Sequence, residues 1–571
     1  AAVSASILAL LAGACGSSPS SSGSAGSSHS GSSRGSGSSG GSGSSGGSGS
    51  SGGSSSSKSG SSGSGSSAGS GTLTVSDVDL DTLVPAKTEL SFAEVEELWA
   101  PLVAFNPNGS LRYVQAQSIA ARDRDKVWTI HLRPGWTFDN GQPVTAQSYV
   151  DGWNFTAYKP NANANASELA EIAGYNAVDP LKGNPTAKTM SGLKVLSKYA
   201  LQVTLSKPDS QFPDELCSGD TGFAPMPTAG LANLKKFATD PIGDGPYEMD
   251  GAANLNEQVK LKAYPGYKGT KPASPHLTFQ LFSNADTAYT ATQAGQVDID
   301  PAAPQDKYSQ IASNFGTRVV KVPGESLDFL GFPLFDKRFQ NIKLREAISL
   351  AIDRPAIVKA LLGGEASPAD GLLAPGILGG GGKQCNYCYY DPAKAKQLLA
   401  QAGGWQGPMV IAYPGGAGYD QEFQAIANQL SQNLGISSVR AQPSSGFSSF
   451  LSGLTSHKFT QGPFRGHWGS LYPSAANILS SIFVPGASSN ASAGGYTNPA
   501  VTAAIAAGNS ATSPAAAEKD YQSAAKTILS DVAVVPLFYP TYPAVYAQNV
   551  HNVHATPHEI GIDFDAATVG S

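Results

Sequence analysis

The sequence predicts a mixed α/β fold of two or three domains that follow an N-terminal segment unable to fold by itself. The chain has 571 residues, and about 500 of them remain after that segment, which suits domains of ~100–200 residues each. Stretches with period-2 alternation and stretches with helical periodicity both occur along this remainder. One stretch, residues 127–153, combines the two patterns around a tight turn.

Residues 127–153 predict a strand, a turn and a helix in succession. The strand is indicated by apolar residues that alternate with polar ones: Trp128, Ile130 and Leu132. Asn140-Gly141 favours a tight turn because both residues tolerate positive φ. Thr145 can cap a helix. The apolar positions of this helix recur at helical spacing: Tyr149, Val150 and Trp153.

The composition argues against several function classes. Charged residues make up 14% of the chain, and the net charge is -6. Without a basic patch, nucleic acid and anionic membrane surfaces are poor partners. No apolar stretch of ~20 residues follows the N-terminus, so no membrane span is expected in the mature protein. No catalytic constellation is recognisable, and we expect neither an enzyme nor a cofactor.

The N-terminus resembles the processing site of a bacterial lipoprotein. Cys15 ends an apolar run, and residues 11–15 (LAGAC) resemble a lipobox, so Cys15 is expected to carry a lipid. Residues 1–15 then form the remnant of a signal peptide, since a charged n-region and a first Met are missing. Residues 16–71 are almost wholly Gly and Ser and predict a disordered tether. The alternative is an ordinary secretory signal whose cysteine is incidental.

Further elements are predicted along the rest of the chain. Helix 391–403 has the clearest ends, because Asp391 can cap it, Pro392 occupies its first position and Gly403 stops it. The other expected elements are strand 73–75, helix 90–105 with a kink at Pro101, strands 193–195 and 200–205, a strand from Lys260 to a corner at 264–267, a helix from Asp286 stopped by Gly295, strand 326–332, helix 341–354 with a second helix after Pro355, and strand 534–538.

Six stretches in series resemble the extracellular solute-binding proteins, family 5, which serve dipeptide and oligopeptide ABC importers. The stretch from Trp128 to Val150 resembles the family signature, although Asn140 and Ser148 stand where the family usually has Asp. The turn at 240–247 also matches, with Asp244 in place of Thr. The remaining matches lie at 344–354, 390–403, 494–499 and 534–538. The resemblance covers about 73–546.

This resemblance implies a periplasmic-binding-protein-like α/β fold of type II, cluster C. It has two lobes built from three domains, with a hinge and a ligand cleft. The implied boundaries are 72–108 for the first part of domain I, 109–231 for domain II, 232–323 for the second part of domain I, 324–540 for domain III and 541–571 for the last part of domain I.

The resemblance also suggests ligand-binding residues. The family holds its ligand near a W-x-x-D-Y segment, in which the Asp neutralises the ligand's α-ammonium. Trp468 and Tyr472 match this segment, but Leu471 replaces the Asp, so either another carboxylate performs this task or the ligand has no free amine there. The family geometry would also direct three aromatic side chains to the cleft: Trp99, Phe329 and Phe332. Core packing is the alternative for all the aromatic residues.

Arg465 and His467 precede the same segment. They could receive a ligand carboxylate as charge-assisted donors, and a solvated loop is the alternative.

Cysteine and histidine spacing leaves several interpretations open. Cys385-Asn-Tyr-Cys388 could be a redox motif, half of a zinc site or a local disulfide. A disulfide is favoured if the protein is exported, because disulfides persist in the oxidising environment outside the cell. Cys217 is then left as the odd cysteine. His551, His554 and His558 have metal-like spacing, and some relatives with this fold carry nickel complexes. Pro557 prevents a regular helix there, however, and we expect a solvated C-terminal segment without a metal.

These features predict a monomeric, lipid-anchored substrate-binding subunit of an ABC importer. It would capture oligopeptides between two lobes and deliver them to membrane permease and ATPase subunits, at the outer face of the cytoplasmic membrane. One alternative is the same fold with a non-peptide solute, such as an oligosaccharide, an opine-like compound or a metal chelate, which Leu471 favours. Another is a surface protein for signalling or adhesion without a transport role.

Overall fold

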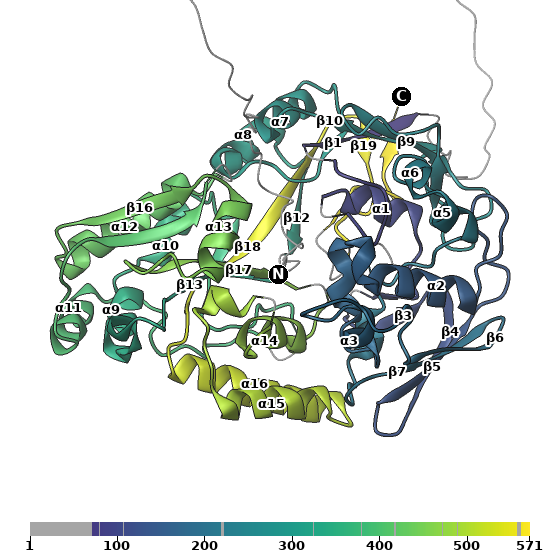
Figure 1. The fold of residues 1–571 in the computed structure, drawn as a ribbon. Helices are drawn as coiled ribbons and strands as arrows, with labels where there is room; N and C mark the ends of the chain where they lie inside the picture. The colour runs from purple at the N-terminus through teal and green to yellow at the C-terminus, as the bar shows by residue number, and fades with distance from the viewer. Residues whose placement is uncertain are drawn as a thin grey trace, which may run out of the picture. The chain divides into compact units, whose positions relative to one another are not determined.

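The computed structural model describes residues 71–570 except 79, 89, 107, 218–221, 324, 378–379, 416–417, 471, 488 and 557–560. The expected signal-peptide remnant with Cys15, nearly all of the tether, Leu471 and His558 lie outside these residues. All the described residues belong to one structural unit (Figure 1). Within it, no helix combines the length and the apolar character that a membrane crossing requires.

A large mixed sheet holds twelve of the described strands. Its order is β16 (Val439–Ser444), β15 (Met409–Pro414), β17 (Phe464–Gly469), β13 (Ser326–Gly331), β18 (Val535–Tyr546), β11 (Ile299–Asp300), β1 (Thr72–Asp77), β10 (His276–Leu281), β9 (Gln258–Ala263) and β8 (Tyr247–Met249), while β12 (Val319–Pro323) and β14 (Ala366–Pro368) pair with β18. Both parallel and antiparallel pairs occur, for example β1 with β10 and β13 with β17.

Strand β18 is the longest strand and joins two apolar cores (Figure 1). Its first half pairs with β13 and β14, and its second half pairs with β11 and β12. Val535 and Leu537 belong to the larger core, whereas Tyr542 and Ala544 belong to the second core. One continuous segment is therefore shared by both cores.

The larger core lies between this sheet and a set of amphipathic helices. The helices that contribute to it are α9 (Ile342–Leu350), α10 (Arg354–Ala360), α11 (Pro392–Gln401), α12 (Asp420–Leu434), α14 (Ala475–Phe483), α15 (Pro499–Asn509) and α16 (Pro514–Ser530). Helix α13 (Phe447–Thr455) packs in a smaller cluster beside β15 and β17, and η4 (Lys337–Gln340) and η5 (Asn490–Ala493) are 3-10 turns.

Short helices surround the second core. They are α1 (Phe92–Leu98), α5 (Thr228–Ala232) and α6 (Leu234–Phe237). A smaller apolar cluster that includes Val545 of β18 contains α7 (Ala285–Gln293), η3 (Gln305–Gln310) and α8 (Ile311–Phe315). Two separate strand pairs also occur: β2 (Val103–Phe105) with β3 (Leu111–Tyr113), and β19 (Val550–His551) with β20 (Thr568–Val569).

A separate antiparallel sheet contains the strand–turn–helix unit at 127–153. Its order is β4 (Ala116–Arg122), β5 (Val127–Leu132), β7 (Ala200–Thr204) and β6 (Leu193–Ser197). Helix α2 (Ala146–Ala157) begins after Thr145, whose hydroxyl accepts from the Ser148 amide in a capping box. This confirms the predicted strand and helix. The elements α3 (Tyr175–Val178), α4 (Phe212–Glu215), η1 (Lys159–Asn161) and η2 (Ala164–Leu169) accompany this sheet.

Most predicted elements are present, with one clear exception. The helix expected at 90–105 ends at Leu98, and 103–105 form strand β2 instead. Trp99 already has extended backbone angles, and the residue before Pro101 is sterically disfavoured from the helical region. The proline therefore ends the helix rather than kinking it. Helix α11 behaves as expected, because the Asp391 side chain accepts from the Lys394 amide at 2.9 Å.

Cys385 and Cys388 form a disulfide with 5.4 Å between their Cα atoms. Cys385 is buried in the larger core, where the bridge closes a turn before α11. Cys217 is half-buried and packs against the apolar core of the four-stranded sheet β4-β5-β7-β6. His551 and His554 are exposed.

Candidate ligand pocket

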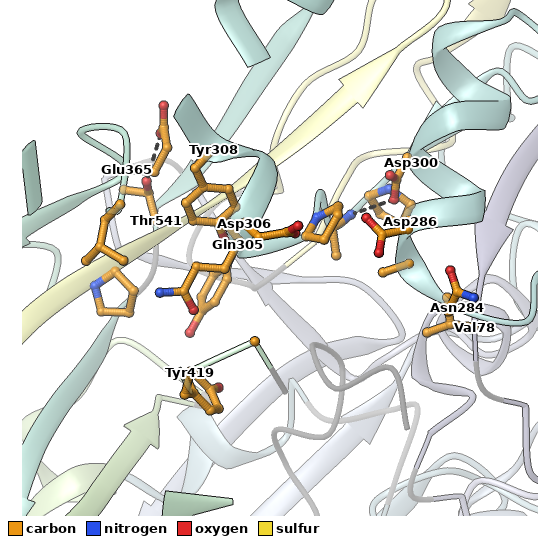
Figure 2. Close-up of a pocket in the computed structure, with 18 of the residues that line it drawn as sticks. Val78, Asn284, Asp286, Asp300, Gln305, Asp306, Tyr308, Glu365, Tyr419 and Thr541 are labelled. Atoms are coloured by element: carbon orange, nitrogen blue, oxygen red, sulfur yellow. Dashed lines mark hydrogen bonds between the residues drawn. The ribbon is translucent and has the colours of Figure 1, made fainter. Parts of the chain in front are cut away.

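A cavity of about 300 Å³ opens beside the middle of β18. Its wall combines segments far apart in sequence, including the end of β1, residues 300–308, β13, the start of α12, β17 and β18. In Figure 2, Gln305, Tyr308, Glu365, Tyr419 and Thr541 lie on one side of the view, while Asn284, Asp286 and Asp300 lie on the other. The pocket thus brings together residues from both of the cores that β18 joins.

The wall of this pocket is strongly acidic. Seven of its described residues are carboxylic acids: Asp77, Asp286, Asp300, Asp306, Asp328, Glu365 and Glu422. Among the described residues on the wall, Arg465 is the only basic one. Low-dielectric surroundings strengthen the field of such a set, so the pocket favours a ligand with positive charge.

Arg465 is already engaged by a carboxylate of the pocket. In the β13–β17 ladder, His467 lies opposite Asp328 and Arg465 lies opposite Leu330, so the three polar side chains share one face. Asp328 Oδ1 accepts from Arg465 Nη2 at 2.8 Å and lies 2.7 Å from His467 Nδ1. The guanidinium carbon also lies 4.1 Å from the ring centroid of Tyr419.

The charges of this group control its protonation. Burial by itself would raise the pKa of Asp328, but Arg465 and His467 outweigh it and hold the pKa below its ordinary value. Burial lowers the pKa of His467, although Asp328 opposes this shift. Asp328 is therefore ionised at neutral pH and compensates Arg465.

Three other carboxylates of the wall also have cationic partners. Lys307 Nζ lies 2.7 Å from Asp286 and 2.8 Å from Asp306. Lys321 Nζ lies 2.8 Å from Glu365, which also accepts from the Thr541 hydroxyl at 3.2 Å. These ion pairs reduce the charge that these acids present to a ligand.

Asp300 and Glu422 differ from these four acids and from Asp77, whose side chain is hydrogen-bonded to Glu94. Neither has a lysine, arginine or histidine nitrogen within 4.0 Å among the described residues. Glu422 accepts from Gln305 Nε2 at 3.3 Å, while Asp300 accepts from the Ser76 hydroxyl and the Ala302 amide. Burial raises the pKa of each to about 7, and Asp328 adds to the shift at Glu422. Among the described residues, Asp300 and Glu422 are thus two buried acids of the wall without an ion-pair partner.

Buried acids of this kind predict that the protein is more stable at pH 6.5 than at pH 8.5. Burial raises the pKa to about 7 or 8 in several places: Asp209, Asp214, Asp244, Asp300, Glu422 and Asp565. The folded state binds more protons than the unfolded state over this window, so the free energy of unfolding rises as pH falls, by about 1 kcal/mol or more in total. His467, with its lowered pKa, stays mostly neutral throughout. Thermal unfolding at equal ionic strength measures this, and an unfolding temperature that drops at pH 6.5 would contradict it.

The two basic residues proposed from sequence lie on strand β17. The side chains of Arg465 and His467 are 8% and 9% exposed, which corrects the alternative of a solvated loop. Arg465 is on the pocket wall, but Asp328 already pairs with both Arg465 and His467. A role as receptors of a ligand carboxylate is thereby weakened.

Trp99, Phe329 and Phe332, which we expected at the cleft, are buried in the apolar cores instead. Phe329 and Phe332 are fully buried in the larger core. Alternation along β13 places Phe329 on the face opposite Asp328. Trp99 packs in the second core at 1% exposure, and its indole donates to the Pro225 carbonyl at 3.3 Å. None of the three belongs to the pocket wall.

The aromatic residues of the W-x-x-D-Y segment also lie away from this wall. The Trp468 indole donates to Asn477 Oδ1 at 2.7 Å and packs against the larger core. Tyr472 is buried, and its pKa is raised by burial and by the nearby Glu215 and Asp209. Leu471 lies outside the described residues.

Asp300, Asp328 and Glu422 were not predicted from the sequence as site residues. For Asp328, one signal was available, because a charged residue at the centre of the apolar strand 326–332 needs a partner if it is buried. Asp300 and Glu422 gave no such local signal. Their common position on the pocket wall depends on long-range pairing of β11 and on the placement of α12.

A family model described as bacterial extracellular solute-binding proteins, family 5 middle, matches residues 112–490. The glutathione-binding protein GsiB of Escherichia coli K12 is 27% identical over 321 residues, which are 56% of this chain and 58% of that protein. The corresponding GsiB protein of Shigella flexneri has the same values. The alignment thus spans less than two thirds of these curated relatives.

Solved structures share the fold over a larger part of the chain. The Escherichia coli murein tripeptide binding protein MppA is 21% identical, with a TM-score of 0.73 over 88% of this chain and 99% of that one. OppA of Haemophilus influenzae, in complex with the peptide RPPGFSPFR, is 20% identical with a TM-score of 0.71 and covers 88% and 99% of the two chains. At these identities the likeness shows the fold alone, and it confirms the predicted α/β fold of periplasmic binding proteins.

Proposed function

This chain belongs to the bacterial extracellular solute-binding proteins of family 5, and on that premise we propose that it captures short peptides with a free amino group for an ABC importer. The observation that supports this most is the charge of the pocket, whose only described basic residue, Arg465, is already paired with Asp328. A buried cation is costly without an opposite charge. This wall supplies such charges.

The size of the pocket and the ligands of similar proteins support a peptide ligand. A volume of about 300 Å³ is at the lower end of the range of small-molecule sites, which suits a short peptide better than a long one. Similar proteins are described as binding glutathione and a murein tripeptide, and both of these ligands are tripeptides. Other relatives of the same fold are described with longer peptides.

The remaining parts of the proposal come from the sequence. We propose that Cys15 carries a lipid anchor, and that the Gly/Ser-rich segment 16–71 tethers the binding domain near a membrane permease and its ATPase subunits. The boundaries given above for domains I, II and III also stay part of this proposal, as does a monomeric state.

A thermal-shift panel tests the ligand class. The purified protein is heated with tri-alanine, with N-acetyl-tri-alanine, with free tetra- and pentapeptides, and with oligosaccharides. A ligand at a hundredfold excess over its Kd stabilises the folded state by about 2.7 kcal/mol, which moves the midpoint visibly. We expect the largest rise with free tripeptide and a much smaller one after acetylation. A response to sugars alone, or to no peptide, would refute the peptide proposal.

A further inference from the structure

The carboxylates of the pocket wall are not equivalent as receptors for a cation. Asp328 is compensated by Arg465, Glu365 by Lys321, and Asp286 and Asp306 share Lys307. A ligand cation gains the least electrostatic stabilisation from a carboxylate that is already paired with a lysine or arginine. Asp77 is hydrogen-bonded to Glu94. Asp300 and Glu422 remain, and neither has an ion-pair partner among the described residues.

Asp300 is held rigidly by its neighbours. It ends β11, where Ile299 pairs with Val75 of β1 and Asp300 itself pairs with Val545 of β18. Its Oδ1 atom accepts from the Ser76 hydroxyl and from the Ala302 amide, each at 3.3 Å. The position of Asp300 on the wall is seen in Figure 2. The carboxylate is thus fixed in one orientation before any ligand binds, so little side-chain entropy would be lost on binding.

The second oxygen of Asp300 lacks a partner. Asp300 is 3% exposed, and its Oδ2 atom is buried without a hydrogen-bond partner among the described residues. A buried acceptor without a donor is destabilising, and more so when it is charged. Asp300 is also a residue of the cavity wall, which makes a ligand in the cavity the candidate source of the missing donor.

Glu422 is better satisfied than Asp300. Its Oε2 atom accepts from the Gln305 amide at 3.3 Å. Arg465 also favours its ionised form, although burial and Asp328 together raise its pKa. Of the two acids, Asp300 would therefore gain more from a ligand that donates a hydrogen bond and carries a positive charge.

We propose that Asp300 receives a primary ammonium group of the ligand, a task that family relatives assign to an Asp at the position of Leu471. The assignment rests on the proposed function, since it requires a ligand with a free amine. A primary ammonium offers three donors, which satisfy the unpaired Oδ2 atom and provide the opposite charge. The α-ammonium of a peptide and the side chain of lysine share this chemistry.

The test compares the wild type with Asp300→Asn by isothermal titration calorimetry of the full chain. Asparagine keeps the Oδ1 acceptor and the size of the side chain but removes the charge. We expect the Kd for tri-alanine to rise about 10- to 100-fold, as for the loss of a charged hydrogen bond. Asp151→Asn on α2, outside the pocket wall, is the matched control and should leave this Kd unchanged.

Three peptides separate a binding role from a structural one. In the wild type, N-acetyl-tri-alanine should bind much more weakly than tri-alanine, whereas in Asp300→Asn the two should bind with similar affinity. N-acetyl-Ala-Lys-Ala identifies the source of the ammonium. If it binds the wild type tightly and loses affinity in Asp300→Asn, the lysine side chain occupies the site, and if it binds weakly to both, the α-ammonium does.

Other outcomes would overturn the assignment. Equal binding of tri-alanine by the wild type and by Asp300→Asn refutes the role of Asp300 but leaves the peptide function intact. If tri-alanine affinity is lost in Glu422→Gln but not in Asp300→Asn, the ammonium group is bound by Glu422 on α12 instead. Failure of the wild type to bind any peptide overturns the proposed function together with this inference. The unfolding temperature of Asp300→Asn without ligand should at least equal that of the wild type at pH 8, because a buried charge is removed.

Discussion

Replacing Asp328 by alanine is expected to lower the free energy of unfolding by about 3–5 kcal/mol, because it breaks a buried ion pair from one side. Arg465, whose side chain is 8% exposed, would keep its charge without its ion-pair partner, although the ring of Tyr419 and the acid of Glu422 remain nearby. The guanidinium cannot lose its proton at any ordinary pH. Chemical denaturation followed by circular dichroism measures this loss.

A double-mutant cycle distinguishes a broken ion pair from a general packing defect. The variants are Asp328→Leu, Arg465→Met and the combination of both. Replacing both partners by apolar groups removes the unpaired charge, so the double variant should lose clearly less stability than the sum of the two single variants. Simple additivity would mean that the pair contributes no coupling.

Acid pH offers a second check on the same pair. The pKa of Asp328 is lowered in the folded state, so its contribution is fully present above the unfolded value of about 3.9. The contribution is lost as pH falls through the folded pKa. The stability difference between the wild type and Asp328→Ala should therefore persist from pH 8 to about pH 4 and shrink below that.

Gly494→Ala is expected to lower the free energy of unfolding by a similar amount, about 3 kcal/mol or more. Gly494 has a φ of 66°, and a Cβ atom built on it would lie 1.7 Å from the Phe332 carbonyl oxygen. Relief of this contact requires backbone movement at the edge of the larger core, since the clashing atom is not part of a side chain.

The neighbouring residue provides a matched control. Gly495 has a φ of 72°, but a Cβ atom built there meets nothing within 4 Å. Gly495→Ala should therefore cost only the conformational strain of about 1–2 kcal/mol. The two variants are compared by denaturant titration. Equal losses would show that the positive φ, and not the contact with Phe332, sets the cost at Gly494.

The secondary structure could be predicted where local chemistry determines it. Helix α11 has a capping Asp391, a proline in its first turn and Gly403 after its end, and helix α2 has its cap at Thr145. The length of β18 could not be predicted in this way. The sequence indicated a strand only at 534–538, yet it continues to Tyr546, because the later residues find partners in β11 and β12 that come from much earlier in the chain.

The pocket was harder to predict than the fold. Alternation along 326–332 correctly separates two faces of a strand, but it does not say which face meets a cavity. The aromatic face with Phe329 was expected at the cleft, whereas the face with Asp328 lines the cavity. Asp300 and Glu422 come from separate segments, and their shared environment arises only from tertiary packing. No local pattern reports that two acids lack ion-pair partners.

The position of β18 in the chain has a consequence for synthesis on the ribosome. Strands β11, β12, β13 and β14 all precede it, and all of them pair with it. A nascent polypeptide therefore lacks the strand common to both cores until residue 546 of 571 has emerged. Contacts of such large sequence separation form late, since the entropy of loop closure must be overcome first. The growing chain thus stays incompletely folded, and accessible to chaperones, until β18 has been synthesised.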